Sequence, residues 1–385
     1  MKIALVYSSK EGMSRSDECG SKCHPDSDNG EPPPDLYAEC DSDATINAVM
    51  ASLEENHHVF PIESDKWAFE CLKKVRPDLV FNIAERLFGP NRESHIPAIC
   101  EILGIPYTGS DPLTLGICLD KSRTKEILSY HDIPNPKFWI AESYSALPDN
   151  MEMPVIIKPL YEGSSKGIRN NSVVRHRTDL SKRIKDVISS YRQPAIVEAF
   201  LSGREFTIGV LGNSPNLEIL PIVEIDHTQL PRGAAPIYSY EAKWIWDRPQ
   251  QPLKIFKCPA EISCVLKNRI EEIVHRTVQV LKIKDWCRID IRLDQNGTPN
   301  ILEVNPLPGI LPNPEDNSCL PKAARAAGYS YSMLLHRVVE EAVLRYRIKP
   351  TDFAAKAHKD ERKKERPYVY RYRLQHISSD PSISQ

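Results

Sequence analysis

The stretch that decides the fold is CRIDIRLDQNGTPNILEVNPLPG, residues 287–309. Two apolar segments, 286–293 and 299–304, flank the turn sequence DQNG at 294–297, a pattern that predicts a β-hairpin. Because side chains alternate between the two faces of a strand, Glu303 and Asn305 project from one face, and Arg288 and Asp290 share a face on the other strand. The hairpin is expected to bring Asp290 beside Glu303 and Asn305.

These side chains indicate a metal site. Carboxylate and amide oxygens suit Mg²⁺ that bridges nucleotide phosphates, and Arg288 beside them suits a developing oxyanion. The alternative is a polar stripe that faces solvent. That alternative does not explain the apolar residues interleaved with the stripe, namely Ile289, Ile291, Ile301, Leu302 and Val304.

A second motif, VIIKPLYEGSSKG at 155–167, predicts a phosphate-binding loop. A strand ends in Lys158 and is followed by small residues whose backbone N–H groups can approach phosphate. Taken alone, the motif could also be a surface hairpin.

A third motif, IVEAFLSGREFTIGVLG at 196–212, ends one strand at Glu198 and begins another at Glu205. A carboxylate at such a hinge can accept hydrogen bonds from ribose hydroxyls. Without the other two motifs, Glu198 and Glu205 would be interpreted as ordinary surface acids.

Composition and charge exclude several classes of protein. The chain has 385 residues, 41% of them hydrophobic and 26% charged, with a net charge of −2. It therefore lacks the basic field expected of a nucleic-acid-binding protein. No window approaches the ~18 apolar residues of a membrane span, and the short run KIALVY at 2–7 is typical of a first strand, not of a signal peptide. We expect a cytoplasmic protein with free thiols.

The alternation of apolar segments predicts two kinds of architecture. Residues 1–119 read as an open α/β (Rossmann-like) sheet, in which 14–43 is a flexible acidic loop. Residues 120–212 and 213–349 read as a small central α+β domain and a C-terminal α+β domain. Residues 350–385 read as a basic polar tail, either solvated or in contact with a partner.

The ordered motifs resemble the D-alanine–D-alanine ligase family of ATP-grasp enzymes. Besides the three motifs above, they include GIPYTGSDPLTLGICLDKSRTK (104–125), YSYEAKW (238–244) and CLPKAARAAGYSYS (319–332). The resemblance implies an ATP-grasp fold, with ATP between the central and C-terminal sheets, and a ligase that joins two small amino-acid-like substrates through an acyl phosphate. It also suggests a homodimer.

The resemblance assigns roles to individual residues. For ATP it implies Lys121, Lys158, Glu162, Gly163, Ser164, Ser165, Glu198, Phe200, Leu201, Glu205 and Lys243. For two Mg²⁺ ions, or Mn²⁺, it implies Asp290, Glu303 and Asn305. For catalysis it implies Arg288 and the Gly309 N–H as an oxyanion hole, with Lys243 and Ser164. For the substrates it implies Glu11, Glu85, Trp244 and Ser318.

The chain departs from the family on the side of the first substrate. Glu85-Arg86 stands where the cell-wall enzymes have a His-Gly pair, and Trp244 replaces a tyrosine. The amine-binding glutamate is displaced, so that either Glu11 or Glu39 could take its place. We therefore hypothesise a ligase of natural-product type whose first substrate is not D-alanine. The alternatives are a housekeeping cell-wall ligase, a non-catalytic relative that binds nucleotide, and a small-molecule kinase.

Four residues of the acidic loop invite a zinc interpretation. They are Cys19, Cys23, His24 and Cys40. Their spacing is not that of a zinc ribbon, and the fourth ligand is distant. An acidic loop without metal is the favoured interpretation.

Overall fold

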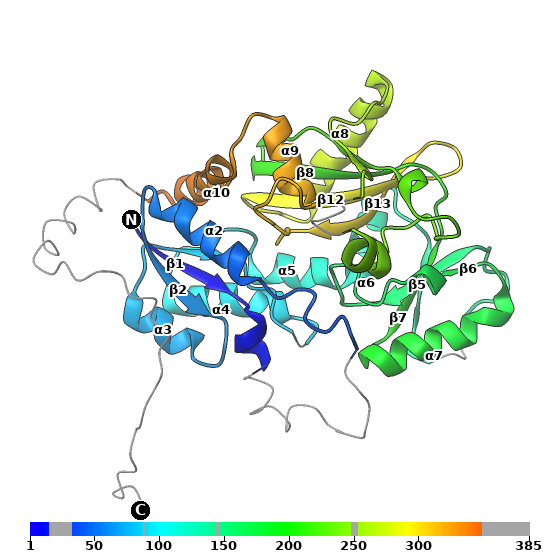
Figure 1. Cartoon of the computed structure of the whole chain (residues 1–385), viewed down its shortest axis with the longest axis horizontal. Helices are drawn as coiled ribbons and strands as arrows, with labels where there is room; N and C mark the ends of the chain where they lie inside the picture. Colours follow the sequence, from blue (N-terminus) through cyan, green and yellow to red (C-terminus); the bar gives the residue numbers. More distant parts are fainter. Residues whose placement is uncertain (15–32, 88, 144–146, 248–252, 349–385) are drawn as a thin grey trace, which may run out of the picture. The chain divides into compact units, whose positions relative to one another are not determined.

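The N-terminal sheet is parallel and has strand β1 (Lys2–Tyr7) at its centre (Figure 1). Strands β2 (His58–Glu63) and β3 (Leu79–Asn82) pair with β1 on either side. Residues 3–6 of β1 are completely buried, as expected for a parallel strand covered on both faces. Helices α2 (Asp43–Glu54), α3 (Ala68–Val75) and α4 (His95–Leu103) belong to this part of the chain. The computed structural model describes residues 1–14, 33–87, 89–143, 147–247 and 253–348.

Two short helices connect this sheet to the rest of the chain. Asp111 accepts a hydrogen bond from the Thr114 N–H at 2.9 Å, so helix α5 (Pro112–Leu119) begins at the predicted Asp-Pro junction. In the same way, the Asp120 side chain accepts hydrogen bonds from the Ser122 and Arg123 N–H groups in the first turn of helix α6 (Lys121–Tyr130). The cap fixes Lys121 at the helix start, where it faces the second and third sheets.

The central sheet is antiparallel, in the order β4 (Phe138–Ala141), β7 (Ala195–Ala199), β5 (Val155–Pro159) and β6 (Val173–Val174). Helix α7 (Leu180–Tyr191) packs on it through Ile184 and Val187, which are completely buried. We name residues 160–167, which follow β5, the glycine–serine loop. This loop therefore leaves the sheet directly beside Lys158.

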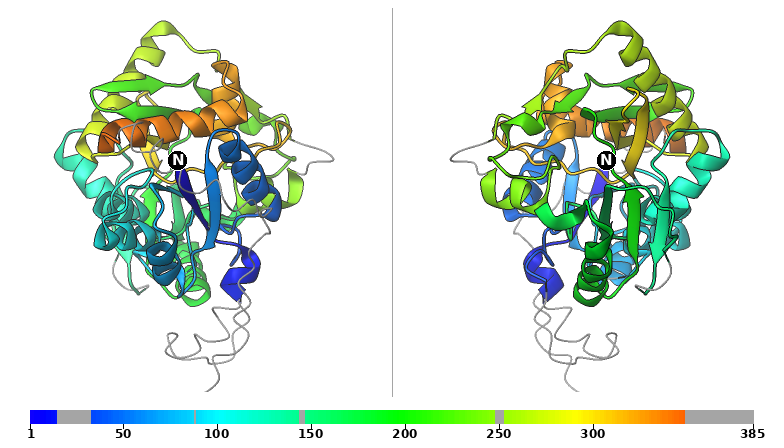
Figure 2. Two further views of the ribbon diagram at one scale, coloured as in Figure 1. Left: turned by 90° about the vertical axis from the view of Figure 1, so that its left-hand side faces the viewer. Right: turned by 90° about the vertical axis from the view of Figure 1, so that its right-hand side faces the viewer.

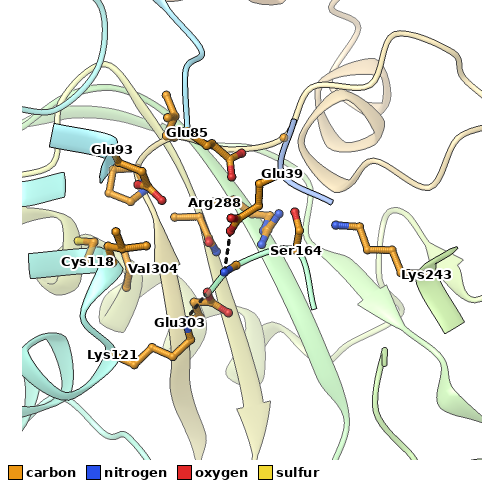
Figure 3. Close-up of a pocket in the computed structure, with 16 residues that line it drawn as sticks. Glu39, Glu85, Glu93, Cys118, Lys121, Ser164, Lys243, Arg288, Glu303 and Val304 are labelled. Carbon is orange, nitrogen blue, oxygen red and sulfur yellow. Dashed lines mark hydrogen bonds and ion pairs between the residues drawn. The ribbon is translucent and has the colours of Figure 1, made fainter. Parts of the chain in front are cut away.

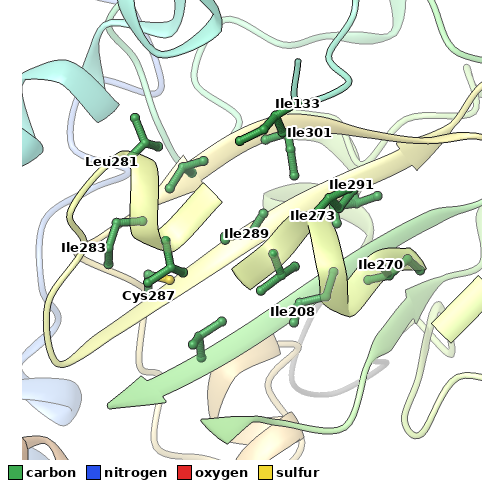
Figure 4. Close-up of a cluster of buried hydrophobic side chains, with 14 of the residues drawn as sticks. Ile133, Ile208, Ile270, Ile273, Leu281, Ile283, Cys287, Ile289, Ile291 and Ile301 are labelled. Carbon is green, nitrogen blue, oxygen red and sulfur yellow. The ribbon is translucent and has the colours of Figure 1, made fainter. Parts of the chain in front are cut away.

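The third sheet is antiparallel and contains the predicted hairpin, β12 (Trp286–Leu293) and β13 (Pro299–Asn305). Strand β8 (Glu205–Asn213) pairs with β12, and the remaining strands are β9 (Asn216–Ile219), β10 (Val223–Ile225) and β11 (Phe256–Lys257). Helix α8 (Cys264–Val280) covers one face, where Ile270 and Ile273 meet Ile289 and Ile291 (Figure 4). The opposite face of the hairpin is left for polar side chains.

Helices α9 (Cys319–Ala326) and α10 (Tyr331–Tyr346) complete this part of the chain. Helix α10 lies beside α2 (Figure 2), and Ser332 donates a hydrogen bond to Glu55 at 2.6 Å. Arg345, near the end of α10, forms a bidentate pair with the completely buried Asp285 at 2.8 and 3.0 Å. Since Gly109 N–H also donates to Asp285, this pair ties the N-terminal part to the third sheet.

The three sheets confirm the predicted combination of α/β and α+β parts, with two corrections. Strand β8 was expected in the central domain, but it pairs with β10 and β12, because its alternating apolar residues complete the third core. The predicted flexible acidic loop is wrong for its described part, 33–43, since Asp35 and Glu39 are buried there. Cys19, Cys23, His24 and the tail from 349 onward lie outside the described residues.

The domain boundaries stay predictions. Residues Met1–Arg347 form one compact unit. Among the described residues, no helix is long and apolar enough to cross a membrane. Within the same residues, Cys40 and the other cysteines are unpaired thiols.

Candidate active site

The hairpin β12–β13 brings the predicted polar residues together. Asp290 is directly opposite Glu303, and Arg288 is opposite Asn305. Arg288 donates to both Asp290 oxygens, at 3.1 Å from Nε and 3.0 Å from Nη2. The Asn305 amide donates to Asp290 Oδ2 at 3.3 Å. Since Ile289 and Val304 are buried on the other face, the alternation of the sequence is what separates the polar site from the core.

The hairpin carboxylates fit a divalent cation. Burial, and then the neighbouring Glu303, raise the pKa of Asp290 in spite of Arg288. Burial would also raise the pKa of Glu303, but Lys121 and Lys158 hold it below its ordinary value. Two adjacent carboxylates and an amide oxygen on one sheet face are the donor set that Mg²⁺ prefers. Among the described residues, no group of three or more His, Cys, Asp or Glu side chains is placed to hold a metal ion, so the hairpin set depends on the Asn305 amide for its third donor.

Two lysines project into the space above the hairpin. Lys121 lies 3.4 Å from Glu303 Oε1 and donates to the carbonyl of Glu162. Lys121 therefore bridges the hairpin and the glycine–serine loop. Lys158 Nζ lies 3.1 Å from Glu198 Oε1, and Lys125 Nζ lies 3.5 Å from the same oxygen. Lys158 and Glu198 thus form a buried charged cluster with Lys125.

The resemblance implies that Glu198 and the backbone around Phe200 and Leu201 hold adenine, but none of these three residues lines the cavities described below. The Glu198 carboxylate is 1% exposed and faces the two lysines, so it does not line a cavity. The Phe200 ring lies against the Arg292 guanidinium at 4.8 Å. The sequence pattern could not show this, because Lys125 comes from helix α6, far from the motif.

Glu205 is the residue for which a ribose contact was predicted. It lines the larger cavity together with Lys158. His227 Nε2 and Arg292 Nη1 each lie 3.0 Å from Glu205 Oε2. Burial would raise the pKa of Glu205, but the bond to His227 and the charge of Arg292 hold it low. Glu205 is therefore anionic and held by two partners on one oxygen, which leaves Oε1 for a hydroxyl donor.

The glycine–serine loop has a constrained backbone. Ser164 and Ser165 both have left-handed backbone conformations, with φ of 49° and 61°. Non-glycine residues adopt such angles mainly where the surroundings enforce them, often at functional sites. Ser165 donates to the Tyr238 carbonyl at 2.9 Å, and the Trp244 indole donates to the Ser164 carbonyl at 3.3 Å. Trp244 thus contacts the loop through its indole N–H.

Lys243 approaches the loop from the π-helix Glu241–Trp246. Its ammonium group is directed toward Ser164 (Figure 3). Burial, and then the charge of Arg288, lower the pKa of Lys243. π-helical turns are rare and often mark functional sites, which fits a lysine that must meet a ligand.

Two adjoining cavities connect these groups. The smaller lies around Glu303 and Asn305 and the larger around Lys158 and Glu205, and both open to solvent. Lys243, Arg288 and Gly309 line both cavities. The predicted residues on the walls of one or both are Glu85, Lys121, Lys158, Gly163, Ser164, Ser165, Glu205, Lys243, Trp244, Arg288, Asp290, Glu303, Asn305, Gly309 and Ser318. Glu11, Glu162, Glu198, Phe200 and Leu201 are absent from the walls.

Gly309 and Ser318 lie on the same side of the larger cavity. Ser318 Oγ donates to the Gly309 carbonyl at 3.2 Å and accepts from the Leu311 N–H at 3.2 Å. Among the described residues, the Gly309 N–H has no protein acceptor. An N–H group without an acceptor next to Arg288 provides the donor pair that an oxyanion hole requires.

Of the two candidates for the amine-binding glutamate, Glu39 lines the cavities and Glu11 does not. Glu11 is exposed, whereas Glu39 is 6% exposed and lines both cavities. Arg92 Nη2 lies 3.0 and 2.9 Å from its two oxygens, and Lys166 Nζ lies 3.0 Å from Oε2. Burial would raise the pKa of Glu39, but Arg92 and Lys166 lower it to about 2. Sequence reasoning missed Arg92 and Lys166 because nothing local marks them as its partners.

Two further carboxylates line the smaller cavity without a protein partner. Glu85 and Glu93 form no hydrogen bond or ion pair within the described part of the chain. Burial raises the pKa of Glu85 well above its usual range, and Glu39 adds to this. Burial also raises the pKa of Glu93 to about 7. Figure 3 shows both residues around the cavity that also contains Glu39 and Arg288.

Comparisons with known proteins point to one family. Residues 127–340 match the family model described as D-ala D-ala ligase C-terminus. The chain is 34% identical to the uncharacterized protein y4sG of Sinorhizobium fredii over 78% of this chain and 88% of that protein. It is 34% identical to a D-alanine–D-alanine ligase of Bordetella pertussis over 64% of this chain and 73% of that enzyme.

A solved structure shows the same fold. It is a D-alanine–D-alanine ligase of Bacillus anthracis complexed with ATP, which aligns with a TM-score of 0.63 at 23% identity. The alignment covers 90% of this chain and 98% of the other. Together with the family model, which spans more than half of the residues, these matches confirm the predicted ATP-grasp fold. The chain belongs to the D-alanine–D-alanine ligase family and is an ATP-dependent ligase that forms a C–N bond.

Proposed function

We propose that this ligase joins two small amino-acid-like substrates through an acyl phosphate and that its first substrate is not D-alanine. The observation that supports the reaction is the hairpin set Arg288, Asp290, Glu303 and Asn305 across the cavities from the glycine–serine loop. The observation that supports a changed substrate is Glu85, an unpaired carboxylate on the wall of both cavities.

In this proposal ATP lies between the central and third sheets. Lys121 and Lys158 contact its phosphates, and Glu205 receives a ribose hydroxyl. Glu198 acts indirectly, because it holds Lys158 in place and keeps it charged. Asp290, Glu303 and Asn305 would hold two Mg²⁺ ions, which would neutralise charge on the phosphate oxygens. Lys243 would reach the transferring phosphoryl group from the opposite side.

The acyl transfer then requires stabilisation of an oxyanion. An oxygen of the first substrate's carboxylate attacks the γ-phosphorus, and ADP leaves. The amine of the second substrate attacks the resulting acyl carbon, and the carbonyl oxygen becomes negative. Arg288 and the Gly309 N–H stabilise that charge, after which phosphate leaves and the amine loses its proton. Ser318 lies where it can hold the carboxylate of the second substrate.

The first substrate would occupy the smaller cavity. Arg92, Lys166 and the Gly163 N–H already surround Glu39, so its negative charge is compensated within the protein. Glu85 has no such contacts among the described residues. Burial raises its pKa well above the ordinary value, so a cationic group beside it would favour its ionised form. We infer that Glu85 contacts the amino group of the first substrate. A housekeeping role in cell-wall synthesis, with D-alanine in both sites, is equally consistent with the relatives.

An assay of substrate pairs tests the proposal. Purified protein with ATP and Mg²⁺ is given D-alanine alone or a panel of paired amino acids, and both ADP and product mass are measured. We expect ADP and a condensed product with pairs whose first member is another amino acid, and little turnover with D-alanine alone. Rapid formation of D-alanyl-D-alanine would contradict the changed substrate and leave the ligase assignment intact. A phosphorylated product without condensation would contradict the acyl transfer.

A further inference from the structure

The described end of the acidic stretch, which we name the acidic strap (residues 33–41), binds the glycine–serine loop at two points. Glu39 Oε1 accepts a hydrogen bond from the Gly163 N–H at 2.7 Å. Asp35 Oδ2 accepts from the Gly167 N–H at 3.0 Å. The two acids are four residues apart, and so are the two glycines. The strap therefore holds both ends of the segment that contains Ser164 and Ser165.

Asp35 is buried and binds the end of helix α7 as well as the loop. It is 1% exposed, and its Oδ2 also accepts from the Tyr191 hydroxyl at 2.6 Å, at the end of helix α7. Arg169 Nη2 lies 3.7 Å from the same oxygen. A carboxylate that joins a helix end and a loop amide in the interior fixes the position of one relative to the other.

The second anchor is a buried group of four charges. Glu39 and Glu162 each form ion pairs with both Arg92 and Lys166. The Lys166 Nζ atom lies 2.5 Å from Glu162 and 3.0 Å from Glu39. Lys166 is 2% exposed, so this lysine of the loop binds the strap and does not face the cavities. Arg92 also donates to the Tyr161 carbonyl at 2.7 Å, which extends the contact to the start of the loop.

Gly163 is required by the close approach of the strap, and Gly167 by close packing on Pro159. A Cβ atom at Gly163 would lie 2.7 Å from Glu39 Oε1. A Cβ atom at Gly167 would lie 2.4 Å from the Pro159 side chain, and Gly167 has a φ of +71°. The GSSKG sequence thus serves the contact with the strap as well as any approach to phosphate.

We propose that Asp35 and Lys166 are positioning residues that hold the glycine–serine loop over the nucleotide through the acidic strap. This inference rests on the proposed function, in which the loop covers the phosphates of ATP. On the loop's other side, the Tyr238 carbonyl accepts a hydrogen bond from the Ser165 hydroxyl. The Trp244 indole donates a hydrogen bond to the Ser164 carbonyl. The strap and these contacts hold the loop between them, which limits the access of water to an acyl phosphate beneath it.

The test combines hydrogen exchange with nucleotide affinity. Asp35→Ala is compared with wild type and with Glu152→Ala, which removes an exposed carboxylate of the same type. We expect amide exchange at 163–167 to become about tenfold faster in Asp35→Ala, the factor typical for one lost bond to a charged acceptor. Affinity for a non-hydrolysable ATP analogue with Mg²⁺ should fall by a similar factor, and Glu152→Ala should match wild type.

Coupling provides the second readout. In Asp35→Ala, more phosphate should be released per molecule of condensed product than in wild type, since a loosened loop admits water. Unchanged exchange at 163–167 would overturn the proposal, and so would faster exchange with unchanged analogue affinity. If Asp35→Ala does not fold, Tyr191→Phe, which removes one of the two bonds to Asp35, should shift exchange in the same direction. Exchange and affinity need no turnover, so a failed ligase assay would refute the proposed function and leave this test valid.

Discussion

Replacing Glu198 by Gln separates two interpretations of this residue. The family resemblance implies that Glu198 contacts adenine, whereas the structure places its carboxylate 3.1 Å from Lys158 and 3.5 Å from Lys125. Glu198→Gln leaves two buried ammonium groups without their counter-ion. Removing one member of a buried ion pair costs about 3–5 kcal/mol, and two lysines share this carboxylate. We therefore expect the free energy of unfolding to fall by at least about 3 kcal/mol.

The same substitution should change the charge of Lys158. Burial alone would lower the pKa of Lys158, and Glu198 keeps it above its ordinary value. Without Glu198, nucleotide affinity should become dependent on pH in the alkaline range, where wild type is constant. Urea unfolding gives the stability, and titration with an ATP analogue gives the affinity. A variant as stable as wild type, with only weaker affinity that does not vary with pH, would refute the buried cluster and support the adenine contact.

Three further predictions concern the oxyanion site, the joint between parts and pH. Arg288→Ala should lower the rate of condensed-product formation ~10²–10³-fold; a loss below tenfold in a product assay would argue against an oxyanion role. Asp285→Asn should lower the unfolding free energy by about 3 kcal/mol, because Arg345 then lacks its buried partner, with unchanged KM for ATP; unchanged urea unfolding would contradict this. Because the folded pKa of Glu39 is depressed, its stabilisation is complete above about pH 4.5 and is lost as pH falls toward about 2. Acid unfolding of Glu39→Gln should lack this part of the pH dependence, and a profile parallel to wild type would refute the assignment.

The hairpin could be predicted in detail because the pattern that defines it is local. Alternation over 286–305 and the turn at 294–297 place Asp290 opposite Glu303, and the structure shows this register. The cap at Asp111 was predictable for the same reason, since an N-cap depends on residues three positions apart.

Contacts between distant segments could not be predicted. The acidic stretch suggested a solvated loop because carboxylates are rarely buried unless paired, and the partners of Glu39 lie at positions 92 and 166. The adenine contact of Glu198 was implied by the family resemblance, and its pairing with Lys125 could not be foreseen because Lys125 lies on another element. Most of the charged residues that the sequence pattern singled out line the cavities, but the pattern could not assign their partners.

The most direct test of the account is a crystal structure of the protein with Mg²⁺ and a non-hydrolysable ATP analogue. The account predicts metal density within coordination distance of Asp290, Glu303 and Asn305, with the terminal phosphate between Lys121 and the backbone of Ser164 and Ser165. Metal bound elsewhere, or phosphates outside the cavities shared by Lys243 and Arg288, would contradict it.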